Sequence, residues 1–139
     1  MNENCTDFAF VGANVWQLVE AQAGIFNEQV NGTNPAEYLF QTAASNNITV
    51  IRMFAEGTTN NLTLQTGPHS YNQSALKALD QTVAMAGKHG IKLTLILGDT
   101  WGTPESIARF ASWSNTSVHN FFLDSQAINL YKVCLRIAV

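Results

Sequence analysis

The 139-residue chain alternates short, nearly continuous apolar runs with longer segments in which apolar residues recur at helical spacing. The apolar runs cover residues 8–13, 48–54 and 91–97, and each has the length of a strand that is buried on both faces. Helical segments lie between and after these runs, and strands separated by helices pair in parallel through right-handed crossovers. The order therefore predicts a single α/β domain built on a parallel sheet.

Four helices are predicted from capping residues and apolar periodicity. The clearest start is Asn34, followed by Pro35 and Glu37, and the clearest end is Gly90, which follows a basic last turn. The predicted helices run from 35 to 46, from after Asn72 to 89, from 103 onward and from 124 onward. The residues expected to face the core are Ala36, Leu39, Phe40, Ala43 and Ala44; Leu76, Leu79, Val83 and Ala86; Ile107, Phe110 and Ala111; and Ile128, Tyr131 and Leu135.

Two architectures fit this order, a doubly wound open sheet and part of a (β/α)8 barrel. A complete barrel needs ~250 residues, so 139 residues can hold only part of one. In both architectures, binding and catalysis gather beyond the carboxyl ends of the strands. The residues of interest at those predicted ends are Trp16, Arg52, Glu56, Asp99 and Trp101.

Arg52 lies inside the second apolar run, where it shares a strand face with Val50. A buried guanidinium needs a carboxylate or several carbonyl groups as partners. One interpretation is that Arg52 faces a catalytic carboxylate near the strand end and keeps it ionised. The other is a structural salt bridge, or a side chain that reaches solvent between the helices.

Trp16 and Trp101 follow the first and third apolar runs. Indole rings in a cleft at the strand ends suit sugar rings, because the apolar face of a sugar packs on an aromatic face. The alternative is that they pack inside the protein, as expected for Trp113. Glu56 and Asp99 are either a carboxylate pair for acid–base catalysis or solvated loop residues.

The composition argues against several kinds of partner. Seven Lys and Arg residues are scattered singly, so no basic patch for nucleic acid is expected. No apolar stretch reaches 18 residues, so no membrane span is expected. His69, His89 and His119 share no metal-ligand spacing and no phosphate-binding glycine motif occurs, so neither a metal nor another cofactor is expected. No defined protein partner is indicated either.

Asparagine and threonine supply much of the polarity of this charge-poor chain, in which 12% of residues are charged. By chance, 14 Asn and 21 Ser or Thr predict about two N-x-[ST] sequons, whereas six occur. Glycans there would solubilise the surface, so the excess predicts a secreted glycoprotein, unless Asn-rich loops produce sequons by accident. Residues 1–10 lack the pattern of a signal peptide. The candidate glycosylation sites are Asn4, Asn31, Asn47, Asn61, Asn72 and Asn115.

Cys5 and Cys134 are too few for a disulfide scaffold. Whether they pair depends on the distance between them, which the sequence does not give. The oligomeric state, the exact glycan and the occupancy of the sequons are likewise left open by the sequence.

Several segments, taken in order, resemble the amino-terminal part of the plant and fungal endo-β-1,4-mannanases of glycoside hydrolase family 5. Residues 10–18 are similar to the first barrel strand and its aromatic end, and residues 43–54 to the first helix and the second strand with its arginine. Residues 90–93 open a third strand that Trp101 and Gly102 follow, and residues 121–124 lead into a helix. Each segment alone is weakly specific, whereas the ordered set covers nearly the whole chain.

The resemblance implies a (β/α)8 barrel that hydrolyses β-mannosidic bonds with retention. It implies a catalytic Glu after strand four and another after strand seven, and the chain contains neither strand. A retaining glycosidase needs two carboxyl groups about 5–5.5 Å apart. Residues 1–139 are therefore expected to be part of a catalytic domain, with about three βα units and a following helix, and to be inactive alone.

By the same resemblance, no catalytic residue lies in this chain, and Arg52 supports the missing nucleophile. Trp16, Arg52 and Trp101 are the expected substrate-binding residues, and Asp99 stands where the family commonly has Asn. A mannan or related polysaccharide is the expected partner, outside the cell. Two alternatives stay open: a separate carbohydrate-binding module, and an unrelated flavodoxin-like domain without enzymatic activity.

Overall fold

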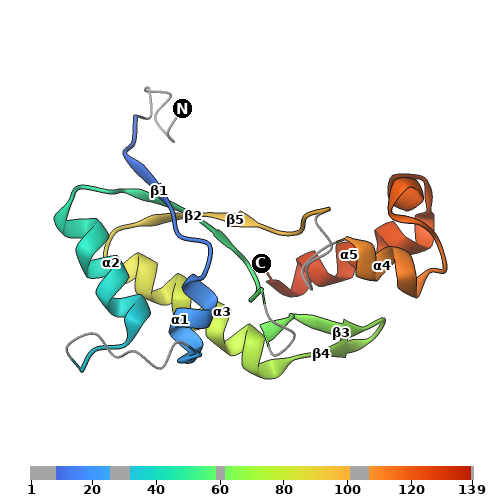
Figure 1. The fold of residues 1–139 in the computed structure, drawn as a ribbon, viewed down its shortest axis with the longest axis horizontal. Helices are drawn as coiled ribbons and strands as arrows, with labels where there is room; N and C mark the ends of the chain where they lie inside the picture. The colour runs from blue at the N-terminus through green and yellow to red at the C-terminus, as the bar shows by residue number, and fades with distance from the viewer. Residues whose placement is uncertain (1–8, 26–31, 59–61, 101–106, 139) are drawn as a thin grey trace.

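A three-stranded parallel sheet forms the centre of the computed structural model (Figure 1). Its strands are β1 (Gly12–Asn14), β2 (Val50–Phe54) and β5 (Lys92–Ile96), in the order β1-β2-β5. The three predicted strands are confirmed, although β1 begins later than expected. The structure describes residues 9–25, 32–58, 62–100 and 107–138.

Three helices cover one face of this sheet: α1 (Leu18–Ala23), α2 (Pro35–Ser45) and α3 (Gln73–Lys88) (Figure 1). The helices α2 and α3 were predicted from the sequence, whereas α1 was not. Because α1 has six residues, it is too short to show an apolar period. It nevertheless buries Leu18 and Val19 completely.

The two faces of the sheet differ sharply in character. Ala13, Ile51 and Leu93 are paired across the strands and pack in the core under the helices. The next row, Asn14, Arg52 and Thr94, is exposed on the opposite face. A doubly wound sheet would carry helices on both faces, whereas α1, α2 and α3 lie on one. The arrangement is that of part of a βα barrel.

The capping residues correctly predicted where α2 and α3 begin. Asn34 accepts hydrogen bonds from the N–H groups of Ala36 (2.9 Å) and Glu37 (3.4 Å). Asn72 accepts the equivalent bonds at the start of α3 from Ser74 (3.0 Å) and Ala75 (3.3 Å). Each asparagine therefore satisfies backbone donors that the helix itself leaves unpaired.

The buried face of α3 is rotated from the predicted one. Leu79 and Ala86 are buried as expected, but Val83 is 47% exposed and Leu76 is half-buried. The buried side of α3 is formed mainly by small residues, and α3 packs against α1. The buried residues of α3 are Ala75, Ala78, Leu79, Thr82 and Ala86.

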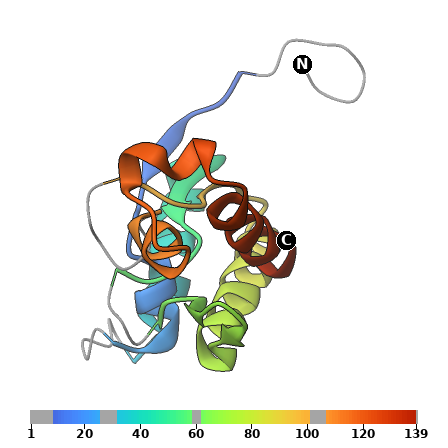
Figure 2. The ribbon, with the colours of Figure 1, turned by 90° about the vertical axis from the view of Figure 1, so that its right-hand side faces the viewer.

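A second group of elements lies at the carboxyl-end side of the sheet (Figure 2). It contains α4 (Ala108–Trp113), the 3-10 helix η2 (Val118–Leu123) and α5 (Ser125–Ala138). A short hairpin, β3 (Gln65–Gly67) and β4 (Ser70–Tyr71), lies below it in Figure 1. The hairpin follows β2 in the chain and was not predicted from the sequence.

Aromatic side chains hold this second group together. Phe110 packs edge-to-face on Trp113 and Tyr131, and Phe121 packs edge-to-face on Tyr131. Trp113 therefore has the packing role expected of it. The predicted burial of Ile107, at the N-cap of α4, and of Phe110 and Ala111 within α4 is confirmed.

The predicted core face of α5 is wrong by about one position. Ile128, Tyr131 and Leu135 are only half-buried, while Ala127, Leu130 and Cys134 form the buried row. By contrast, the predicted face of α2 is confirmed. Its residues Ala36, Phe40 and Ala43 are buried, and Leu39 and Ala44 pack against the core.

Candidate functional site

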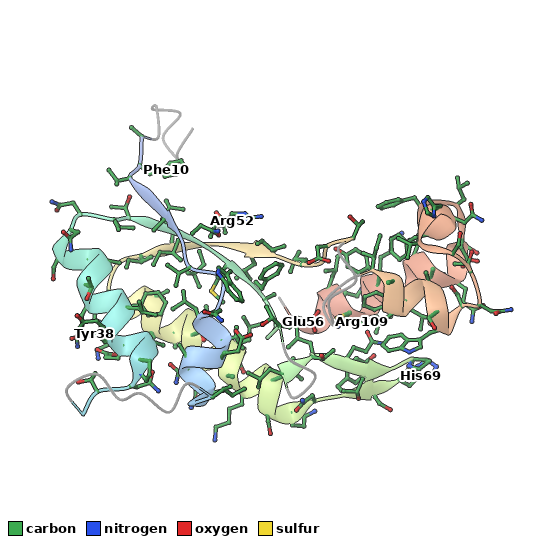
Figure 3. The ribbon with its side chains drawn as sticks, viewed as in Figure 1. Phe10, Tyr38, Arg52, Glu56, His69 and Arg109 are labelled. Carbon is green, nitrogen blue, oxygen red and sulfur yellow. The ribbon has the colours of Figure 1, made fainter. Side chains whose placement is uncertain are left out.

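Arg52 lies on the open face of the sheet, opposite the helices (Figure 3). Its Nη1 donates a hydrogen bond to Asn14 Oδ1 at 3.1 Å, and its side chain is exposed. The expectation of a buried guanidinium is therefore wrong. The same register that pairs Arg52 with Asn14 also places Thr94 beside it on β5.

The bond between Asn14 and Arg52 fixes the direction of the guanidinium on this face. Asn14 is the last residue of β1, and the next N–H along the chain, that of Val15, donates to the Arg52 carbonyl at 2.9 Å. The two residues are therefore held by backbone pairing as well as by their side chains. Sequence reasoning did not connect Asn14 with Arg52, because their contact depends on the register between β1 and β2.

Trp16 lies two residues beyond β1 and is 42% exposed. An exposed indole beyond a strand end can pack on the apolar face of a sugar ring. The second predicted indole, Trp101, lies outside the described residues. Asp99 follows β5 and is half-buried, and its carbonyl accepts a hydrogen bond from the N–H of Ile107 at 2.8 Å.

Glu56 forms a buried ion pair with Arg109 (Figure 3). Arg109 Nη2 lies 2.6 Å from Glu56 Oε1 and Nη1 lies 3.0 Å from Oε2. Glu56 Oε2 also accepts a hydrogen bond from the N–H of Leu64 at 2.6 Å. Since both carboxylate oxygens are occupied, this arrangement ties the segment after β2 to α4. Sequence reasoning did not identify Arg109, which no pattern connected with Glu56.

Glu20, on α1, is a second buried carboxylate that holds the segment after β2. Its Oε1 accepts hydrogen bonds from the Thr58 N–H at 2.6 Å and the Thr58 hydroxyl at 2.7 Å, and the residue is 1% exposed. Glu20 and Glu56 therefore both have structural roles in the segment after β2. Glu20 holds Thr58, and Glu56 holds Leu64 and Arg109. Neither is placed on the open face with Arg52.

Cys134 belongs to the surroundings of this ion pair. Its Sγ lies 4.0 Å from Arg109 Nη2, and burial raises the pKa of the thiol to about 11. The thiol is therefore protonated at neutral pH and is not a nucleophile. Cys5 lies outside the described residues. Within the described ranges, no three His, Cys, Asp or Glu side chains come together in a way that could hold a metal ion.

The comparisons with known proteins point to one group of enzymes. No protein-family model matches the chain. Over 106 residues the chain is 33% identical to mannan endo-1,4-beta-mannosidase 2 of Oryza sativa subsp. japonica. The aligned region covers 70% of this chain and 24% of that relative. It is 30% identical over 99 residues to mannan endo-1,4-beta-mannosidase 7 of Arabidopsis thaliana, covering 67% of this chain and 23% of that protein. The chain thus spans about a quarter of the length of these relatives.

Solved structures show the same likeness in three dimensions. The glycoside hydrolase family 5 mannosidase from Rhizomucor miehei superposes with a TM-score of 0.72 at 17% identity, over 94% of this chain and 38% of the enzyme. The endo-beta-1,4-mannanase from Thermotoga petrophila superposes with a TM-score of 0.73 at 21% identity, over 95% of this chain and 30% of the enzyme. At these identities the likeness establishes the fold, which is part of the barrel of those enzymes.

The described residues contain no helix long and apolar enough to cross a membrane. The resemblance to family 5 mannanases is confirmed, and no comparison favours a flavodoxin-like domain. The chain is a sequence relative of the plant mannan endo-1,4-beta-mannosidases, with the fold of part of a glycoside hydrolase family 5 barrel.

Proposed function

We propose that residues 1–139 are part of a catalytic domain that hydrolyses β-1,4-mannosidic bonds with retention, in the breakdown of mannan polysaccharides. The observation that carries this proposal is the 33% identity over 106 residues to a plant mannan endo-1,4-beta-mannosidase. Asn14, the last residue of β1, and its partner Arg52 support it, because barrel enzymes act at the carboxyl ends of their strands. The substrate-binding residues in this chain are Trp16, Arg52 and Trp101.

Arg52 acts in this proposal through charge. A guanidinium that Asn14 directs along the open face stabilises the ionised form of a carboxylate brought close to it. A nucleophilic carboxylate must be ionised when it attacks the anomeric carbon. Arg52 is therefore a positioning residue for a nucleophile, and it does not itself take part in bond cleavage.

The chain alone is expected to have no hydrolytic activity. Retaining hydrolysis needs two carboxyl groups about 5–5.5 Å apart on either side of the scissile bond. Two carboxylates near the sheet already have structural partners: Glu20 accepts a hydrogen bond from Thr58, and Glu56 forms an ion pair with Arg109. The assay is release of reducing ends from galactomannan by the purified chain, and measurable release that survives repeated purification would overturn this expectation.

Binding tests the site directly. Titration with manno-oligosaccharides at millimolar concentration is expected to change tryptophan fluorescence. In Trp16→Ala the fluorescence change on titration is expected to be smaller. The matched control is Tyr38→Ala, because Tyr38 is an aromatic residue of similar exposure, 39%, on α2 (Figure 3). No change in the unsubstituted chain, or an equal loss in both variants, would reject the site.

We also propose that the protein is a secreted glycoprotein. Six sequons where about two are expected by chance support this, as does a surface with few charged groups. Of the six asparagines, Asn47, Asn72 and Asn115 are described by the structure, while Asn4, Asn31 and Asn61 lie outside the described residues. Recovery of the protein from the culture medium of its source, with sugar attached, is the test of this proposal.

A further inference from the structure

Two of the described sequon asparagines occupy the same structural position, at the end of a helix. Asn47 follows α2 with φ 57°, and Asn115 follows α4 with φ 56°. These are the only residues other than glycine with positive φ in the described part of the chain. Left-handed backbone is unfavourable for residues with a Cβ atom, and asparagine is among the few that tolerate it.

Backbone hydrogen bonds define this position as the left-handed residue of a Schellman motif. After α2, the N–H of Asn47 donates to the Ala44 carbonyl at 3.0 Å, and the N–H of Ile48 donates to the Ala43 carbonyl at 3.0 Å. These two main-chain bonds form the cap, and Asn46 Nδ2 adds a hydrogen bond to the Thr42 carbonyl at 2.8 Å. The amide group of the Asn47 side chain is not needed for the cap.

The end of α4 repeats the arrangement. The N–H of Asn115 donates to the Ser112 carbonyl at 3.1 Å, and the N–H of Thr116 donates to the Ala111 carbonyl at 2.9 Å. Asn115, like Asn47, is exposed, and the structure gives neither side chain a hydrogen bond within the described ranges. Both exposed side chains are therefore carried by a turn that backbone hydrogen bonds define.

The end of α3 shows what the fold alone requires at this position. There the residue is Gly90, with φ 69°, and the N–H of Ile91 donates to the Ala86 carbonyl at 2.9 Å. Glycine is the residue best suited to left-handed backbone. Twice the chain instead has an asparagine, followed two residues later by an exposed Thr49 or Ser117.

The third described sequon is built differently. The Oδ1 atom of Asn72 caps α3 by accepting hydrogen bonds from Ser74 and Ala75, and Asn72 is half-buried. Ser74, the hydroxyl residue of this sequon, is itself part of the first turn of α3. A glycan on Asn72 would have to leave from a side chain whose orientation the helix cap already fixes.

We propose that Asn47 and Asn115 are N-glycan acceptors and that Asn72 is not. This inference rests on the proposed secretion of the protein. A transferase with a lipid-pyrophosphate oligosaccharide as donor joins the asparagine Nδ2 to the anomeric carbon of the first sugar. The bond from that carbon to the pyrophosphate oxygen breaks, and the amide proton leaves to a base. At both acceptors the attached glycan extends into solvent without loss of a native contact.

The test is expression of the full chain with a secretory leader in a eukaryotic host, with the chain recovered from cells and medium together. Peptide mass mapping after release of N-glycans in ¹⁸O-labelled water should show the label at Asn47 and Asn115 and none at Asn72. Unmodified Asn47 or Asn115 would overturn the proposal, and so would label at Asn72. Because the oligosaccharide is transferred before export, chain that is retained in the cells is analysed for the label in the same way.

Matched variants separate the sequon from the turn. Thr49→Ala and Ser117→Ala delete one sequon each and leave the asparagine in its left-handed conformation, so each is expected to lose one glycan. Thr49→Ser keeps the sequon and should keep the glycan. Retention of the sugar in Thr49→Ala would contradict the proposal. Mannan binding is measured separately on unglycosylated chain from bacteria. A failure of the glycosylation proposal can therefore be distinguished from a failure of the proposed mannan binding.

Discussion

Glu56 and Arg109 bury opposite charges, and the burial of each charge is favourable only while its partner is present. The Glu56 side chain is 4% exposed and that of Arg109 is 12% exposed, so water screens the pair weakly. We expect Glu56→Gln to lower the free energy of unfolding by about 3–5 kcal/mol. Glutamine keeps an oxygen that can accept from the Leu64 N–H, and the loss therefore reports the unpaired guanidinium. Urea denaturation measures it.

The double variant Glu56→Gln with Arg109→Met is the control for this prediction. It removes both charges and leaves no ion to be buried alone, so its loss of stability is expected to be smaller than that of Glu56→Gln. Ion pairs at the surface contribute less than about 1 kcal/mol. If Glu56→Gln lowers the free energy of unfolding by no more than that, the pair is not buried in solution.

At the residue scale, the sequence drew attention to Arg52 but did not predict its hydrogen-bond partner. Arg52 was singled out because a charged residue interrupts an apolar run, and the structure places it on the open face, at the site side of the sheet. Its partner Asn14 is 38 residues away in the chain. Such a contact depends on strand register, which one sequence does not specify without knowledge of the sheet order.

At the scale of single elements, α2 and the end of α3 are joined by Glu37. Lys88 Nζ lies 2.9 Å and His89 Nε2 3.0 Å from Glu37 Oε1. The hydrogen bond from Lys88, with that from Gln41, lowers the pKa of Glu37 to about 2 from its ordinary 4.5. A lowered pKa means that the carboxylate stabilises the fold fully above about pH 4.5, and that this contribution is lost as the pH falls toward 2.

Glu37→Gln is therefore expected to be less stable than the unsubstituted chain at pH 6, and the difference should shrink between pH 4.5 and 2. Midpoints of urea denaturation across this range provide the measurement. Because Lys88 is 66% exposed, added salt should also reduce the difference at pH 6. A difference that stays constant from pH 6 to pH 2 would mean that the Glu37 carboxylate does not contribute through its charge.

The cap at the start of α2 gives a second prediction at this scale. Asn34→Ala removes the acceptor for the N–H groups of Ala36 and Glu37, and it is expected to cost about 1 kcal/mol. Asn34→Ser keeps a side-chain acceptor and should restore most of that stability. Thermal denaturation of the three proteins measures both effects, and equal stability of the alanine and serine variants would show that the cap is not formed in solution.

The helices also show where prediction from apolar periodicity fails. In α2 the largest apolar side chains, such as Phe40, are the buried ones, so the predicted face is correct. In α3 and α5 the close contacts are made by Ala78 and Ala127, while the larger Val83 and Ile128 lie toward the margin. Periodicity weighted by hydrophobicity favours large residues, whereas close packing of one element on another selects small ones.

At the scale of the whole molecule, the sheet has one covered face and one open face, and β1 and β5 are its edges (Figure 1). The open face carries apolar as well as polar groups, since Phe54 and Ile96 are paired there and are half-buried. A parallel sheet is normally covered on both faces. Exposed edges together with a partly apolar face favour association with another chain.

We therefore expect the purified chain to self-associate as its concentration rises, and Ile96→Lys to reduce this association. Lysine replaces the apolar group on the open face and adds a charge to an edge strand, both of which oppose pairing. Val83→Lys is the matched control, because it exchanges a β-branched residue for lysine on α3, on the covered side of the sheet. Sedimentation velocity over a range of concentrations measures the effect. If Val83→Lys reduces association as much as Ile96→Lys, added charge alone explains the result and the open face is not the contact surface.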